Sequence, residues 1–193
     1  MKKLIGIAGY ARSGKDTFFA RSAKYLNDNG LEAKRYAFAD ALKSEVDSLL
    51  TEYTGISAFT EKDSEKEIVR PLLVTYGTEI RRKLNPNCWI EKITPSVGED
   101  LDKGKYVFIT DVRFENEAQW IKSQGGLMVY VEREGIKPAN HEEHTQNIRM
   151  KKYLNYKIFW PTFGFDDLDK CDEHVEPTIA HILQSEPNFS QVM

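Results

Sequence analysis

A run of residues near the start of the chain has the types and the spacing that hold a phosphate group. The segment Gly9–Thr17 reads GYARSGKDT and fits the pattern G-x-x-x-x-G-K, between a short apolar run and a helix-forming stretch. That context is what the pattern requires. Glycines let successive backbone amides turn inward around phosphates, and the helix N-terminus adds partial positive charge. We therefore expect Lys15 to reach the outer phosphates of a nucleoside triphosphate.

The residue after the lysine departs from the usual pattern. That position is normally Ser or Thr, whose hydroxyl contacts Mg²⁺, but here it is Asp16, with Thr17 next. A carboxylate is a suitable ligand for Mg²⁺, directly or through water, while an acid in the first turn of a helix is also favoured by the helix dipole. We expect Asp16 and Thr17 to lie at the metal, and Arg12 to lie beside phosphate rather than in solvent.

Charged residues also follow two other predicted strands, at the edge of an open α/β sheet where ligands bind. Asp111 ends one strand and could hold Mg²⁺ through water, contact a second substrate or cap the next helix. Arg113 is expected to point into the same crevice. Glu117 either hydrogen-bonds to a ligand there or lies on a solvated helix face. Asp40 and Lys43 occupy the equivalent place after another strand, where Asp40 is either a ligand or a helix N-cap.

The helical stretch between these strands, and a tryptophan after it, offer further candidates. Gly77 lies in the middle of a predicted helix, where glycine costs about 1 kcal/mol relative to alanine, so we expect a ligand or another backbone to approach closely. The adjacent Arg81 and Arg82 cannot share one helix face, and we expect one of them to be solvated. Trp89 either stacks on a nucleobase or belongs to the core.

Short apolar runs alternate with amphipathic segments of helical length along the chain. The expected strands are Leu4–Ala8, Ala33–Phe38, Tyr106–Thr110, Leu127–Val131 and Tyr156–Trp160. The expected helices are Lys15–Asn29, Asp40–Glu52, Glu67–Leu84, Asn87–Ile93, Glu115–Ser123 and Val175–Leu183. Such alternation predicts parallel βαβ units, and hence a three-layer α/β sandwich with a parallel five-stranded sheet.

Two polar segments lack a clear period, Tyr53–Lys66 and Glu134–Lys152. The second interrupts the α/β pattern between the fourth and fifth expected strands. Long irregular insertions of this kind are often lids or plain surface loops. Because the chain also carries a phosphate-binding loop, we favour a lid that closes over a bound nucleotide.

The composition limits the class of protein. The 193 residues, 40% hydrophobic and 30% charged, predict a single globular domain over residues 1–193. A net charge of −3 argues against a protein that coats nucleic acid, and no apolar stretch approaches the length of a membrane span. Cys88 and Cys171 lack metal-ligand spacing and indicate reduced thiols in a reducing compartment.

Taken together, these motifs resemble the phage-type deoxynucleoside monophosphate kinases of the P-loop kinase superfamily. The matching stretches are GYARSGKDT (Gly9–Thr17), FADALK (Phe38–Lys43), RPLLVTYGTEIRRKLNPNCW (Arg70–Trp89), DVRFENE (Asp111–Glu117) and VEREG (Val131–Gly135). All but the first are loose when taken singly, and the resemblance rests on their order and spacing. Family members often carry His-x-x-Glu in the lid region, where this chain has Asn147 in place of the acid, so no role beyond a place in the lid is carried over to that tetrapeptide.

The resemblance implies an adenylate-kinase-like fold with ATP and Mg²⁺ as cofactors and a deoxynucleoside monophosphate as acceptor. Residues 53–87 then form a monophosphate-binding helical region and residues 134–152 the lid. The ATP-binding residues are Gly9, Arg12, Ser13, Gly14, Lys15, Asp16 and Thr17, and the metal residues are Asp16, Thr17 and Asp111. The resemblance implies a substrate-binding set of Arg70, Gly77, Thr78, Trp89, Asp111, Arg113 and Glu117. We expect three further residues to complete it, Asp40, Lys43 and Arg82. The lid residues are Arg133, His144 and Thr145, and the catalytic residues are Lys15, Arg12, Arg113 and Arg133.

Two alternative functions stay open at this point. One is a P-loop kinase for another small metabolite, resembling dephospho-coenzyme A kinase, and the other is an ATP-binding switch that moves a partner. The expected partners are small nucleotides and neither nucleic acid nor membrane, with a homodimer as the commonest closed assembly. The expected location is the cytoplasm, which is that of the host if the protein is phage-encoded.

Overall fold

The computed structural model describes residues 3–161 and 170–184. The chain divides into two compact units. We call residues 1–35 and 99–193 the sheet unit, and residues 36–98 the helical unit. The predicted monophosphate-binding region, residues 53–87, lies within the helical unit, and the predicted lid, residues 134–152, lies within the sheet unit.

The sheet unit is built on a five-stranded sheet with the strand order β2-β3-β1-β4-β5. The strands are β1 (Leu4–Ala8), β2 (Ala33–Tyr36), β3 (Tyr106–Ile109), β4 (Leu127–Arg133) and β5 (Tyr156–Trp160). β1 pairs in parallel with β3 and with β4, and β4 pairs in parallel with β5. Every residue of β1 and β3 is buried, as expected for parallel strands covered on both faces. The predicted parallel five-stranded α/β sheet is confirmed.

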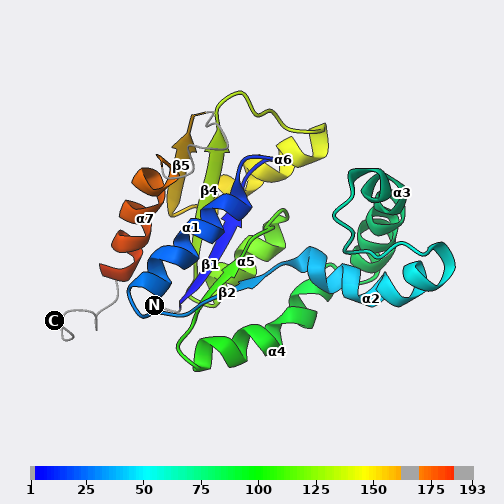
Figure 1. Ribbon diagram of the computed structural model, residues 1–193, viewed down its shortest axis with the longest axis horizontal. Coiled ribbons are helices and arrows are strands. Elements are labelled where there is room, and N and C mark those ends of the chain that lie inside the picture. Colours follow the sequence, from blue (N-terminus) through cyan, green and yellow to red (C-terminus); the bar gives the residue numbers. More distant parts are fainter. Residues whose placement is uncertain (1–2, 162–169, 185–193) are drawn as a thin grey trace. The chain divides into compact units, whose positions relative to one another are not determined.

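Helices cover both faces of this sheet (Figure 1). On one face, α1 (Lys15–Asp28) and α7 (Asp172–Gln184) pack together over Ile5 and Ile7. Between these two isoleucines, Gly6 points the other way, and a Cβ there would lie 2.5 Å from Ile121 Cδ1 of α5 (Glu115–Ser123). Successive strand residues face opposite sides, so α5 covers the second face.

The second polar segment, Glu134–Lys152, was expected to be irregular. It contains a helix, so that prediction was wrong. Helix α6 (His141–Met150) lies within it and contacts α5. The helix begins because the side chain of Asn140 accepts the backbone N–H of Glu143 over 2.8 Å, which satisfies one of the amides left open at a helix start. The 3₁₀ turn Lys151–Tyr153 then leads into β5.

The helical unit contains α2 (Phe38–Thr54), α3 (Asp63–Val74), a π-helical segment (Thr75–Arg82) and most of α4 (Cys88–Asp102). Buried Val46, Leu50, Ala58 and Val69 form a core of its own. One continuous helix had been expected over residues 67–84, but its second half winds into the wider π form. Such segments are rare and are frequent at functional sites.

Helix α4 is longer than the expected helix, which stopped at Ile93. It continues through Pro95, which lacks the N–H for one helical hydrogen bond. Trp89, Ile93 and Val97 recur every four residues and are all buried. Burial of this apolar face outweighs the lost hydrogen bond, at about 1.5–3 kcal/mol for each large side chain.

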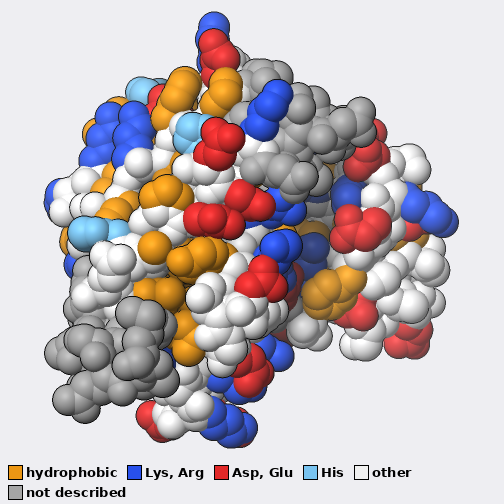
Figure 2. Space-filling model, turned by 60° about the vertical axis from the view of Figure 1, so that its left-hand side comes forward, with side chains coloured by type: hydrophobic (Ala, Val, Ile, Leu, Met, Phe, Trp, Pro, Cys, Tyr) orange, Lys and Arg blue, Asp and Glu red, His pale blue; other side chains and the backbone are white. Residues whose placement is uncertain are grey.

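The surface carries charges of both signs. Acidic and basic side chains are mixed over the face seen in Figure 2, with smaller groups of apolar side chains between them. Among residues 3–161 and 170–184, no helix is both long enough and apolar enough to cross a bilayer.

Candidate active site

The loop between β1 and α1 has the bent backbone that a phosphate cradle needs. Gly9 and Gly14 have φ angles of 147° and 90°, in the region that favours glycine. Arg12, which is exposed, also has a positive φ of 64°. The N–H of Ser13 donates to the carbonyl of Tyr10 over 3.1 Å and closes the turn. Gly14 is the N-cap of α1, so the amides of the first helical turn stand at the end of the loop.

Trp160, at the end of β5, supports this loop from outside. Its Nε1–H donates to the carbonyl of Ser13 over 2.8 Å. A Cβ on Gly14 would lie 2.7 Å from Trp160 Cζ2, so the indole ring packs directly against the loop backbone. Sequence reasoning missed Trp160 as a site residue, because a buried tryptophan in an apolar strand is equally typical of a core.

Lys15 is bent back over the loop. Its Nζ donates to the carbonyl oxygens of Gly9 and Tyr10 over 2.9 and 2.8 Å. Burial, and to a lesser extent the charge of Arg113, lowers the pKa of the Lys15 ammonium to about 8, because both disfavour its charged form. A phosphate group in the loop would supply the negative charge that this ammonium needs.

Several sequence-predicted residues are gathered around Lys15. Arg113 opposes its charge, whereas Asp16 and Asp111 favour it, so all three lie close enough to act on one ammonium. The hydroxyl of Ser13 is buried and has no hydrogen-bond partner within the part of the chain that the structure describes. A buried hydroxyl without a partner is costly, and a phosphate oxygen would satisfy it. The loop therefore fits a phosphate ligand.

The oxygen atoms near the loop also suit Mg²⁺. Asp16 is exposed, and Thr17 and Asp111 are half-buried; carboxylate and hydroxyl oxygens are ligands that this ion accepts. Within the described ranges there is no cluster of three or more His, Cys, Asp or Glu residues that could hold a metal ion. Because Mg²⁺ commonly combines one or two carboxylates with nucleotide phosphates and water, this donor set fits a metal that binds together with a nucleotide.

Two of the alternatives for the acids after β3 were wrong. Phe114, and not Asp111, is the N-cap of α5. Glu117 is fully buried rather than on a solvated face. Its Oε2 accepts the backbone N–H groups of Arg113 and Phe114 over 2.8 and 3.0 Å, as the third residue of a helix does when it turns back to cap the first turn. Glu117 thus holds the backbone of Arg113, and its contact with a substrate stays a prediction.

Helix α6 contacts the phosphate loop directly. Glu143 Oε1 accepts the backbone N–H of Ala11 over 2.9 Å. The hydroxyl of Tyr10 and Nδ1 of His144 lie 3.0 Å apart in a hydrogen bond. His144 was predicted from the sequence, but Glu143 was missed, because no spacing or motif distinguishes it from the adjacent Glu142.

The other two predicted lid residues lie differently. The hydroxyl of Thr145 donates to the carbonyl of His141 within α6 itself. Arg133 is the last residue of β4, so it stands on the sheet and not in an irregular insertion. Arg133 also lies near Cys171: burial raises the pKa of this thiol, and the positive charge of Arg133 acts to lower it.

The remaining substrate candidates lie in the helical unit, where their contact with a substrate stays a prediction. Asp40 stands in the first turn of α2, whose N-cap is Ala37. The N-cap alternative for Asp40 was therefore wrong, since the helix begins earlier than expected, at Phe38. Lys43 Nζ lies 5.4 Å from the centroid of the Phe59 ring. The other candidates follow on α3 and the π-helical segment: exposed Arg70, and half-buried Thr78 and Arg82.

Gly77 and Trp89 belong to the interior of the helical unit. A Cβ on Gly77 would lie 2.7 Å from Leu42 Cδ2, so a side chain, and not a ligand or backbone, makes the close approach expected there. The carbonyl of Gly77 accepts Trp89 Nε1–H over 3.3 Å. Because only 1% of Trp89 is exposed, this tryptophan serves the core in this structure rather than stacking on a base.

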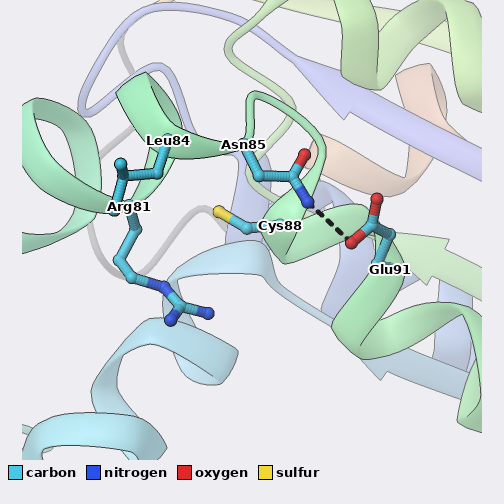
Figure 3. Close-up of a pocket in the computed structure, with 5 residues that line it drawn as sticks. All are labelled: Arg81, Leu84, Asn85, Cys88 and Glu91. Atoms are coloured by element: carbon cyan, nitrogen blue, oxygen red, sulfur yellow. Dashed lines mark hydrogen bonds between the residues drawn. The ribbon is translucent and has the colours of Figure 1, made fainter.

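A cavity of about 240 Å³ lies between the π-helical segment and α4 (Figure 3). The amide of Asn85 donates to the carboxylate of Glu91 over 2.8 Å, and Arg81 Nη1 lies 3.2 Å from Glu45 Oε1. Both Arg81 and Arg82 are half-buried, and 36% of the Arg81 side chain is exposed; the expectation that one of the two is a solvated charge stays a prediction. No predicted substrate residue is among those that line the cavity, which are Arg81, Leu84, Asn85, Cys88 and Glu91.

The chain is similar to known proteins in sequence and in fold. The deoxynucleotide monophosphate kinase family matches residues 47–151. A protein of Acanthamoeba polyphaga mimivirus named "Putative deoxynucleotide monophosphate kinase" is 27% identical over 177 residues, which are 80% of this chain and 86% of that protein. Dephospho-CoA kinase from Campylobacter jejuni is 14% identical and superposes with a TM-score of 0.52, covering 94% of this chain and 98% of that one.

The structural likeness shows a shared P-loop kinase fold. The family match covers more than half of the chain and includes the π-helical segment, α4, β3 and α6. The resemblance that the motifs indicated is thereby confirmed. The chain belongs to the deoxynucleotide monophosphate kinase family.

Proposed function

We propose that this kinase transfers the γ-phosphoryl group of ATP to a deoxynucleoside monophosphate, giving ADP and a deoxynucleoside diphosphate. The observation that carries the proposal is the partly desolvated ammonium of Lys15, bent over a loop of phosphate-binding form. Membership of the family supports a phosphorylated nucleotide as acceptor. The likeness to a dephospho-CoA kinase is one of fold and carries no acceptor.

The chemistry asks for positive charge rather than for a base. The acceptor is a phosphate oxygen, and a phosphate monoester with a second pKa of about 6 is largely dianionic at neutral pH. The difficulty is therefore the approach of two anions, which positioning and cationic groups overcome. We assign this task to Lys15, Arg12 and Arg113, with Arg133 as a further cation. The donors of the loop backbone bind the phosphates of ATP.

Asp16, Thr17 and Asp111 are the proposed Mg²⁺ residues. When bound, the ion would neutralise charge on the transferred phosphoryl group. Exposed Asp16 and half-buried Thr17 follow Lys15 directly, and Asp111 acts on the same ammonium. Their closeness to Lys15 supports a role for them at the outer phosphates.

The acceptor monophosphate is assigned to residues of the helical unit. Asp40, Lys43, Arg70, Thr78 and Arg82 supply hydrogen-bonding groups and positive charge for a monophosphate, with residues 53–87 as the binding region. Residues 134–152 act as the lid, which excludes water because water is a competing acceptor. The contacts of α6 with the phosphate loop support this role.

A panel of acceptors tests the substrate. With ATP and Mg²⁺, we expect the rate of ADP release to rise strongly with one or more deoxynucleoside monophosphates and to stay at the background rate with dephospho-CoA. The measurement is a coupled assay run with each deoxy- and ribonucleoside monophosphate in turn. Stimulation by dephospho-CoA alone would contradict the proposal and assign the chain to the other kind of kinase; slow hydrolysis that no acceptor changes would favour an ATP-driven switch.

A further inference from the structure

One oxygen of the Glu143 carboxylate contacts the phosphate loop, and the other contacts the backbone just before its own helix. Oε1 accepts the N–H of Ala11 over 2.9 Å, and Oε2 accepts the N–H of Ala139 over 2.6 Å. The backbone of Glu143 is held as well, because its N–H donates to the side chain of Asn140 and its carbonyl accepts the amide of Asn147, each over 2.8 Å. The carboxylate therefore reaches the loop from a well-defined place at the start of α6.

The peptide group that Glu143 contacts is also the one that holds Lys15. The N–H of Ala11 and the carbonyl of Tyr10 belong to one peptide, and this carbonyl accepts Lys15 Nζ over 2.8 Å. A trans peptide is planar, so its N–H and its carbonyl point to opposite sides of one rigid group. Glu143 thus sets the orientation of the carbonyl that faces the Lys15 ammonium. Hydrogen bonds in such a chain also strengthen one another.

A second contact between α6 and the loop holds the side chain of Tyr10. The hydroxyl of Tyr10 is hydrogen-bonded to Nδ1 of His144 over 3.0 Å, and the two rings lie 6.5 Å apart between centroids at 31°. Neighbouring residues of α6 therefore hold the two residues that form the peptide. The helix and the bent loop act as one assembly around Lys15.

We propose that Glu143 is a positioning residue for Lys15, acting through the Tyr10–Ala11 peptide. The proposal rests on the role assigned above to Lys15 in binding nucleotide phosphate. Glu143 itself touches the loop backbone and need not contact the substrate. Its effect is to hold the Tyr10–Ala11 peptide in the orientation that suits phosphate binding. Contact of α6 with the loop and binding of a nucleotide should therefore favour one another.

The test compares Glu143→Ala and Glu143→Gln with Glu142→Ala as the matched control. Glu142 is the preceding acid of the same helical turn and is exposed. Affinity for ADP is measured by calorimetry, kcat and KM by steady-state kinetics, and Tm by thermal unfolding. We expect Glu143→Ala to weaken ADP binding about ten-fold, the size expected for loss of one hydrogen bond to a charged group. KM for ATP should rise, while KM for the acceptor stays unchanged.

The conservative variant separates positioning from simple stability. The amide oxygen of Gln can still accept the N–H of Ala11, so Glu143→Gln should recover part of the ADP affinity, and Glu142→Ala should match the wild type. If Glu143→Ala lowers Tm but binds ADP as Glu142→Ala does, the proposal is overturned. ADP binding requires no acceptor, so a wild type that phosphorylates no deoxynucleotide would refute the proposed function and leave this comparison decisive.

Discussion

Replacing Lys15 with methionine is expected to lower kcat by on the order of 10²–10³-fold, the usual cost of losing one preorganised group that stabilises transition-state charge. Methionine keeps the length and the apolar stem of lysine but cannot neutralise phosphate. The fold should persist, because the ammonium is partly desolvated and its removal relieves that cost. Steady-state kinetics and thermal unfolding at neutral pH measure the two effects.

The difference in the free energy of unfolding between Lys15→Met and the wild type should depend on pH. The folded protein holds the Lys15 proton less tightly than the unfolded chain, since the pKa is lowered to about 8 from 10.5. The destabilising effect of Lys15 is therefore complete below pH 8 and disappears as the pH rises towards the unfolded value. We expect Lys15→Met to be at least as stable as the wild type at pH 7, with the difference shrinking above pH 8.

Lys24→Met is the control for the loss of a lysine from α1. Lys24 lies on the same helix, and its exposed side chain pairs with Asp28, so its removal should change stability only slightly and leave kcat unaltered. Turnover by Lys15→Met close to that of Lys24→Met would contradict the assignment of the phosphate site.

Among the substitutions discussed, Gly9→Ala should lower the free energy of unfolding the most. Gly9 has a φ of 147°, and a Cβ there would lie 2.3 Å from the carbonyl oxygen of Val131. The obstacle is backbone of a buried strand, which cannot move away as a flexible side chain can. We expect the free energy of unfolding to fall by about 3 kcal/mol or more, from an unfavourable torsion and from overpacking together.

Gly30→Ala provides the comparison, because it adds the cost of an unfavourable backbone torsion without any steric overlap. Gly30 has a φ of 71° and nothing within 4 Å of a built Cβ, so the expected loss is about 1–2 kcal/mol. Denaturant unfolding of both variants gives the difference directly. Equal losses in the two variants would show that the loop and β4 are not packed as closely as described.

The features that the sequence predicts well are local. The phosphate loop is recognisable because Gly9, Gly14 and Lys15 stand at defined offsets between a strand and a helix. The buried strands are recognisable because β1 and β3 are short, uninterrupted apolar runs. From these two patterns the parallel sheet, the position of Lys15 and the convergence of Asp111 and Arg113 near it follow without the structure.

The features that the sequence leaves open depend on long-range contacts. Trp160 is 147 positions from the carbonyl it binds in the loop, and Glu143 is 132 positions from Ala11. No local pattern reports such a pairing. The interior positions of Trp89 and Gly77 likewise depend on which side chains α2 and α4 bring to them. Helix α4 was expected to end at Ile93, but it continues through Pro95. The helix-breaking effect of proline can be read from the sequence, whereas the burial of the apolar face that outweighs it depends on the tertiary structure.

The most direct test of the central claim is to follow the transferred group. ATP radiolabelled in its γ-phosphate is incubated with Mg²⁺ and each deoxynucleoside monophosphate, and the products are separated by chromatography for the wild type and Lys15→Met. The account predicts label in a deoxynucleoside diphosphate with the wild type, and at most a trace with the variant. Label only in inorganic phosphate, or only in coenzyme A when dephospho-CoA is supplied, would contradict it.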